Sequence, residues 1–155
     1  MTPESLERSL KNHPFCSELS NSTIAFLCGC TKNVRFSADE YLFKENERAD
    51  SLYLIRSGRV ALESHQPGKP AIKVETLTSG GVLGWSTLFP PFRWYVDCRA
   101  LEPTLAFAVD GSCLRGKLDQ DAAFAYSITR RLLLEVHRRL ERARLQQLDV
   151  YKGET

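Results

Sequence analysis

A stretch in the second half of the chain holds the side chains best suited to binding a small anion. Gly84 has no Cβ atom and can therefore form a tight turn, and Ser86 and Thr87, shortly after it, each supply a hydroxyl group. Backbone N–H groups at the start of a short helix attract negative charge, and a guanidinium such as that of Arg93 grips phosphate through paired hydrogen bonds. Together these residues could bind a small anion.

The same stretch is rich in aromatic side chains, which could stack on a planar ligand. They are Trp85, Phe89, Phe92, Trp94 and Tyr95. The alternative is that they only fill the core. Pro90 and Pro91, between them, are expected to end the short helix.

Two of the polar residues also have purely structural interpretations. Ser86 could cap the short helix instead of contacting an anion. Arg93 could form a salt bridge to Asp97 or Glu102 instead of binding a ligand, and Asp97 is expected to be structural.

The cysteines are expected to be reduced and to act as small buried apolar side chains. Their number is odd, and the chain is long enough to fold without disulfides. They are Cys16, Cys28, Cys30, Cys98 and Cys113.

No catalytic or metal-binding pattern is found in the sequence. It lacks a Gly-x-Ser-x-Gly motif and a phosphate-binding Walker loop, and its three histidines are widely separated. We therefore expect no enzyme, no catalytic residue and no metal site. A cupin-like barrel enzyme is the weakest alternative, because such an enzyme needs several histidines on neighbouring strands.

Two kinds of periodicity divide the chain into three regions of one domain, residues 1–155. Residues 1–31 have helical spacing, interrupted at His13-Pro14 and with a capping Ser20 before the second helix. Residues 32–112 contain short apolar alternations separated by turn residues, a pattern typical of a β-sandwich or barrel. Residues 113–155 are expected to be helical, with one long helix between about 119 and 151.

The long helix is expected to pair with a second copy of the chain. It is longer than a small barrel is wide, so one face needs another partner. Leu133, Val136, Leu140 and Ala143 recur at helical spacing and predict a homodimer interface. The alternative is a monomer in which the helix lies along its own barrel. The helix is also rich in arginine, which either forms a solvated face or meets an anionic ligand or an acidic partner.

Residues 43–60 resemble the signature of cyclic nucleotide-binding domains, found in catabolite-activator-type regulators, kinase regulatory subunits and gated channels. They read FKENERADSLYLIRSGRV, and LTSGGVLG at 77–84 resembles the approach to the family's phosphate-binding cassette. The resemblance covers about residues 14–151 and implies a jelly-roll or double-stranded β-helix, mainly β with flanking helices, with the cassette at 80–100. Gly58 suits a tight hairpin, and Asn46, in place of a glycine, tolerates the same left-handed backbone.

The expected ligand site departs from the family pattern in three ways. Trp85 stands where the family has a ribose-binding glutamate, and an indole cannot accept a hydrogen bond from a hydroxyl. Arg93 lies one residue before the position that the family's phosphate-binding arginine would have in this sequence, so either Arg93 or Trp94 occupies that position. Ala143 and Arg144 stand where the resemblance implies small hydroxyl residues that touch the base, and Arg144 could cover a bound ligand.

The resemblance and the composition together predict a stand-alone regulatory module that senses a cyclic nucleotide or another phosphate-bearing ligand. The alternative is a ligand-free interaction module with a degenerate pocket, binding a protein effector.

The chain has 155 residues and a net charge of +2, which is unlike a polyanion-binding protein. After the long helix there is no room for a DNA-reading helix, so we expect no direct DNA contact. The charged N-terminus and the lack of a long apolar run predict a cytoplasmic protein without a membrane span.

Overall fold

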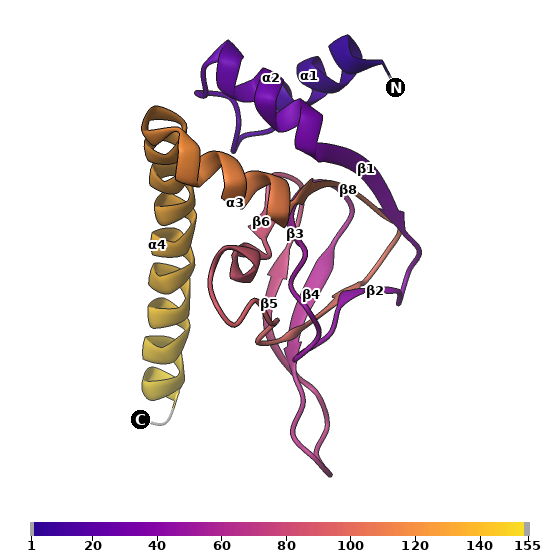
Figure 1. The fold of residues 1–155 in the computed structure, drawn as a ribbon. Coiled ribbons are helices and arrows are strands. Elements are labelled where there is room, and N and C mark those ends of the chain that lie inside the picture. Colours follow the sequence, from indigo (N-terminus) through magenta and orange to yellow (C-terminus); the bar gives the residue numbers. More distant parts are fainter. Residues whose placement is uncertain (1, 154–155) are drawn as a thin grey trace.

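The computed structural model describes residues 2–153 and confirms the predicted order of short helices, strands and a long helix (Figure 1). Residue 1 and residues 154–155 of the expected single domain lie outside the described part. The elements are α1 (Pro3–Asn12), α2 (Asn21–Cys30), β1 (Thr31–Phe36), β2 (Tyr41–Phe43), β3 (Ser51–Ser57), β4 (Val60–Ser64), β5 (Ile72–Leu77), β6 (Val82–Leu83), the 3-10 helix η1 (Trp85–Leu88), β7 (Asp97–Ala100), β8 (Thr104–Asp110), α3 (Gly111–Gln120) and α4 (Ala122–Gly153).

The strands form two four-stranded antiparallel sheets, which confirms the predicted jelly-roll. One sheet has the order β1-β8-β3-β6 and the other the order β2-β7-β4-β5. Alternating residues of both sheets meet in the interior, where Ile55, Val60 and Ala106 are fully buried. This interior includes Trp94 of the cassette, so the core of the sandwich reaches the candidate site.

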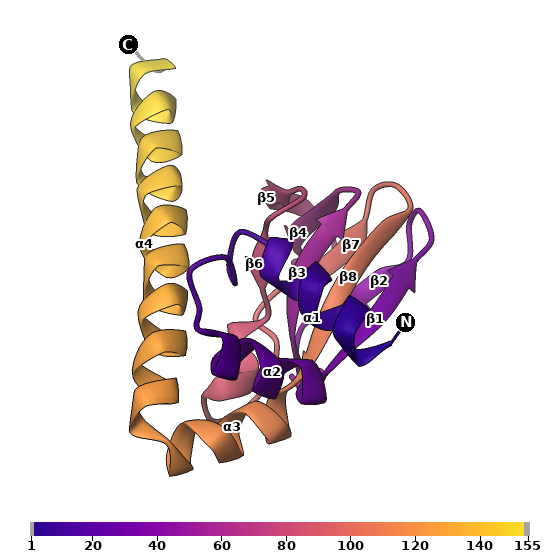
Figure 2. The same ribbon diagram turned by 90° about the horizontal axis from the view of Figure 1, so that it is seen from above.

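The helices cover the outer face of the first sheet and form a second core there. Leu10 and Leu27 of the N-terminal helices, Leu114 of α3 and Ile128 of α4 pack with Phe107 of β8. Only the first turns of α4 take part. Beyond Leu132 the helix continues past β6 and β5 along the side of the sandwich (Figure 2). None of the helices within residues 2–153 has an apolar stretch long enough to span a bilayer.

Local backbone features predicted from single residues are confirmed. The Ser20 hydroxyl accepts a hydrogen bond from the backbone N–H of Thr23 and so caps α2. Asn46 adopts the left-handed conformation with φ 70°, and Gly58 has φ 97° in the β3–β4 turn. A side chain at Gly58 would also overlap Thr104, so the turn requires glycine for space as well as for conformation.

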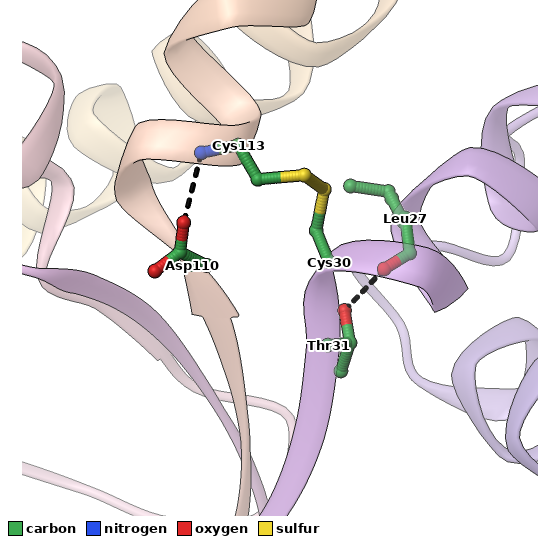
Figure 3. The surroundings of a disulfide bond; sticks show 5 residues. All are labelled: Leu27, Cys30, Thr31, Asp110 and Cys113. Atoms are coloured by element: carbon green, nitrogen blue, oxygen red, sulfur yellow. Dashed lines mark hydrogen bonds between the residues drawn. A yellow bond between two sulfur atoms is a disulfide. The ribbon is translucent and has the colours of Figure 1, made fainter.

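The prediction that all cysteines are reduced is wrong for Cys30 and Cys113. They form a disulfide that joins the end of α2 to the first turn of α3, with a Cα–Cα distance of 5.9 Å (Figure 3). The two residues are 83 positions apart, and only the packing of α2 against α3 brings them together. Cys16 and Cys98 are buried thiols, as expected, and burial raises the pKa of Cys16 to about 12.

Buried His13 predicts a pH dependence of stability. Its ring bridges two backbone groups: Nε2 lies 3.0 Å from the carbonyl oxygen of Ile55, and Nδ1 accepts from the N–H of Phe15. An Nδ1 that accepts is unprotonated, so this geometry selects the neutral ring, and burial lowers the pKa of His13 from its ordinary 6.5.

Because the unfolded chain binds the proton more readily, we expect stability to be lost as the pH falls below about 6.5 and through the lowered folded value. Urea unfolding at about pH 8 and about pH 5 measures the loss. The variant His13→Asn should show a smaller loss than the wild type over the same interval, and an equal loss would contradict the assignment.

Candidate functional site

A cavity of about 310 Å³ lies between the cassette, the edge of the sandwich and α4. This volume is at the lower end of the range for small-molecule sites. Most of its wall is apolar, formed by Phe43, Leu62, Val74, Leu83, Trp85, Trp94, Val96 and Ala143. The remaining lining residues are Gly84, Ser86, Glu75, Tyr95, Arg139, Arg142 and Gln146. Four of the predicted ligand-binding residues, Gly84, Trp85, Ser86 and Trp94, therefore line one cavity.

Trp94 forms the inner wall of the cavity. Its indole is 4% exposed and stacks on Phe43 with ring centroids 3.9 Å apart. Backbone hydrogen bonds tie Trp94 to Asn46 and Glu47 on both sides, which holds its side chain inward. The indole also lies over Gly84, where a Cβ atom would be 3.2 Å from the ring and 2.8 Å from the Ser51 carbonyl oxygen. Gly84 is thus required for this close approach.

Arg93 does not line the cavity and forms neither of the predicted salt bridges. Neighbouring side chains on extended backbone point to opposite sides, so the inward Trp94 directs Arg93 to solvent. There its guanidinium donates to the carbonyl oxygen of Asn46 at 3.3 Å. The proposed salt-bridge partners are engaged elsewhere: Asp97 pairs with His65 at 2.5 Å, and Glu102 lies 4.0 Å from Arg59.

Asp97 has the structural role expected of it. Besides pairing with His65, its carboxylate accepts a hydrogen bond from the backbone N–H of Glu45.

Thr87 faces the protein interior and not the cavity. It is fully buried against Gly111, and its carbonyl oxygen accepts a hydrogen bond from Arg115 of α3. The Arg115 guanidinium also lies 4.5 Å from the centre of the Phe92 ring. Thr87 therefore connects the cassette to α3 and is not available for a ligand.

A cluster of three charged residues joins β5 to α4 at the cavity. The carboxylate of Glu75 lies 2.8 Å from Arg139 Nε and 2.7 Å from an Arg142 terminal nitrogen. Arg139 also donates to the carbonyl oxygen of Val82 and lies 4.3 Å from the centre of the Trp85 ring system. Burial lowers the pKa of Arg139, while the charge of Glu75 opposes this shift. We call Glu75, Arg139 and Arg142 the charge cluster.

Of the two helix residues expected near the ligand, only Ala143 lines the cavity. Arg144 points away from it and lies 3.5 Å from Glu141 on the helix surface. Arg139, Arg142, Ala143 and Gln146 share one face because they recur at helical spacing. That spacing could have identified Arg139, Arg142 and Gln146 from the sequence, whereas nothing in the sequence distinguishes Glu75.

Known proteins are similar to this chain in sequence or in fold. Over 96 residues it is 33% identical to an uncharacterized protein of Mycobacterium tuberculosis, covering 60% of the chain but only 18% of that relative. A cyclic nucleotide-binding domain from Methylobacillus flagellatus superposes with a TM-score of 0.78 at 20% identity, covering 95% of this chain and 83% of that one. The sensor domain of the transcriptional regulator DNR from Pseudomonas aeruginosa gives 0.71 at 17% identity, covering 90% and 93%.

The family model described as the cyclic nucleotide-binding domain matches residues 33–121, which is more than half of the chain. The matched range includes the strands from β2 to β8 and the whole cassette. The sandwich, the cassette and the long helix beside the cavity agree with this match. The chain therefore belongs to the cyclic nucleotide-binding domain family.

Proposed function

We propose that this domain senses a small nucleotide-like ligand in the cavity and reports its presence through α4. The observation that carries the proposal is that α4 forms one wall of the cavity and is attached there by the charge cluster. The sensor-domain relative of the same fold supports a regulatory role.

A ligand can influence α4 only if it binds one position of the helix better than another. The second half of α4 is suited to such a change, because its contact with the sandwich runs through polar side chains and not through a packed core. A ligand that contacts Ala143 and Gln146 would alter the balance between the attached and the detached helix.

Thermal unfolding with cyclic AMP, cyclic GMP, AMP, adenosine and guanosine tests the proposal. A bound ligand at a hundred times its Kd should stabilise the fold by about 2.7 kcal/mol. The same ligand should change amide hydrogen exchange in residues 139–146. Ala143→Trp, which fills the cavity from the exposed helix, is the matched control and should abolish both effects. No stabilisation by any compound, or equal stabilisation of the control, would contradict the proposal.

We also propose that α4 pairs with α4 of a second copy. Leu133 and Leu140 are 69% and 65% exposed, and Tyr126 lies one heptad before Leu133 on the same face. Val136 is exposed on this face too, while Ala143, expected in the same interface, borders the cavity. An exposed apolar stripe of this kind favours a helix-pairing partner.

Leu140→Asp is expected to convert the dimer to a monomer, because it places a charge in the centre of the apolar stripe. Leu145→Asp is the matched control, since Leu145 is also exposed but lies on another face of the helix. Size-exclusion chromatography with light scattering at micromolar concentration measures the mass. A monomeric wild type, or dissociation by both variants alike, would contradict helix pairing.

A further inference from the structure

We infer that the cavity takes an uncharged, planar aromatic ligand of about nucleoside size, and not a ligand held by its phosphate. This inference rests on the proposed function and specifies the ligand class of the same site. Three properties of the cavity carry it: what occupies its inner end, how its cations are engaged, and what its walls offer.

The inner end of the cavity, where the cassette begins, is occupied by an indole. The Trp94 ring lies against Gly84, the residue directly before η1, and stacks on Phe43. The ring therefore takes up the space beside Gly84, the residue at which the short helix of the cassette begins. Arg93, the cassette's own arginine, is directed to solvent and cannot replace the missing charge.

The cations that line the cavity, within residues 2–153, are Arg139 and Arg142, and both are engaged by Glu75. The Glu75 side chain is only 11% exposed. A phosphate bound by these guanidiniums would compete with Glu75 for their N–H groups and would lie next to this largely buried carboxylate of like charge, which is unfavourable. A neutral ligand leaves the charge cluster intact.

The walls offer flat apolar surface with a few polar groups. Trp85 and Trp94 present indole rings, and Leu62 and Val96 complete an apolar pocket. The Ser86 hydroxyl and the Gln146 amide can each donate or accept a hydrogen bond from an uncharged ring substituent. Aromatic walls with few polar groups are typical of sites that select planar neutral molecules.

Tryptophan fluorescence provides a direct readout, because the chain has two tryptophans and both line the cavity. Adenosine and guanosine would be titrated beside cyclic AMP and cyclic GMP, which carry the same bases and differ in the phosphate. The nucleosides should change the emission and bind at least about tenfold more tightly than the matching cyclic nucleotides, since only the latter bring a phosphate that competes with Glu75 for the two arginines.

Glu75→Gln is the diagnostic variant. It removes the carboxylate with little change in shape and frees both guanidiniums, so the preference should shift toward the cyclic nucleotides by about tenfold. Far-UV circular dichroism confirms that the variant is folded. Wild-type binding of a cyclic nucleotide as tight as that of its nucleoside, or an unchanged preference in the variant, would overturn the inference.

The outcomes separate the two proposals. Tight binding of cyclic AMP or cyclic GMP with altered exchange in α4 would overturn the ligand class but retain the sensing function. Nucleoside binding without any change in α4 would retain the ligand class and contradict sensing through the helix. An unchanged emission with all four compounds would overturn the ligand class, and the thermal panel then decides the sensing function on its own.

Discussion

Replacing Trp94 with alanine should lower the free energy of unfolding by about 3–5 kcal/mol, the usual cost of truncating a buried large aromatic residue. The indole is 4% exposed and belongs to the interior cluster of the sandwich, where it stacks on Phe43 and approaches Tyr53. Its removal would leave a void beside a cavity that is already open. Urea unfolding followed by circular dichroism measures the loss without depending on the deleted fluorophore.

Tyr95→Ala provides the matched control for this prediction. Tyr95 is the next residue and also borders the cavity, but it is 71% exposed. Its truncation should change the free energy of unfolding by no more than about 0.5 kcal/mol. If both variants lost the same stability, the assignment of Trp94 as a core residue that closes the inner end of the cavity would be wrong.

Loss of the disulfide between Cys30 and Cys113 should destabilise the domain by about 2–4 kcal/mol. The bond closes a loop that contains the whole sandwich, so its absence releases a large part of the unfolded chain. Cys113→Ser should unfold at lower urea than the oxidised wild type and at the same urea as the wild type treated with reductant. The equal urea midpoints of the variant and of the reduced wild type are the internal control, because both proteins lack the bond.

Thiol titration of the urea-unfolded protein checks the bond directly. Of the five cysteines, three should react before reduction and all five after it. Five reactive thiols in unreduced protein, or a Cys113→Ser variant as stable as the oxidised wild type, would contradict the bond.

The architecture could be predicted because its elements follow from local sequence patterns. Each of these patterns depends on neighbouring residues only: the helical spacing at Leu6 and Leu10, the alternation in the strands, and the stretch after Asp121 that contains no glycine or proline before Gly153. The left-handed backbone at Asn46 and Gly58 follows from the residue types at a turn. The two-residue strand β6 was not predicted, because two residues carry no periodicity.

The candidate site was predicted only in part, because its decisive contacts are long-range. Whether Arg93 or Trp94 points inward depends on backbone hydrogen bonds to residues 46 and 47, almost fifty positions away. The partnership of Glu75 with α4 depends on how the long helix lies on the sandwich. The residue types and the resemblance to the family's cassette identified a region that could bind a ligand, but only the packing determined which side chains reach the cavity.

The attachments of α3 have a mechanical consequence. Arg115 ties this helix to the cassette, Cys113 ties it to α2, and α4 follows it after a single residue. At about 1.5 Å per residue, the 32 residues of α4 extend about 48 Å from this junction. A tilt of about 5° at α3 would therefore displace the far tip of α4 by about 4 Å, so the length of this helix would amplify a small rotation at its attached end.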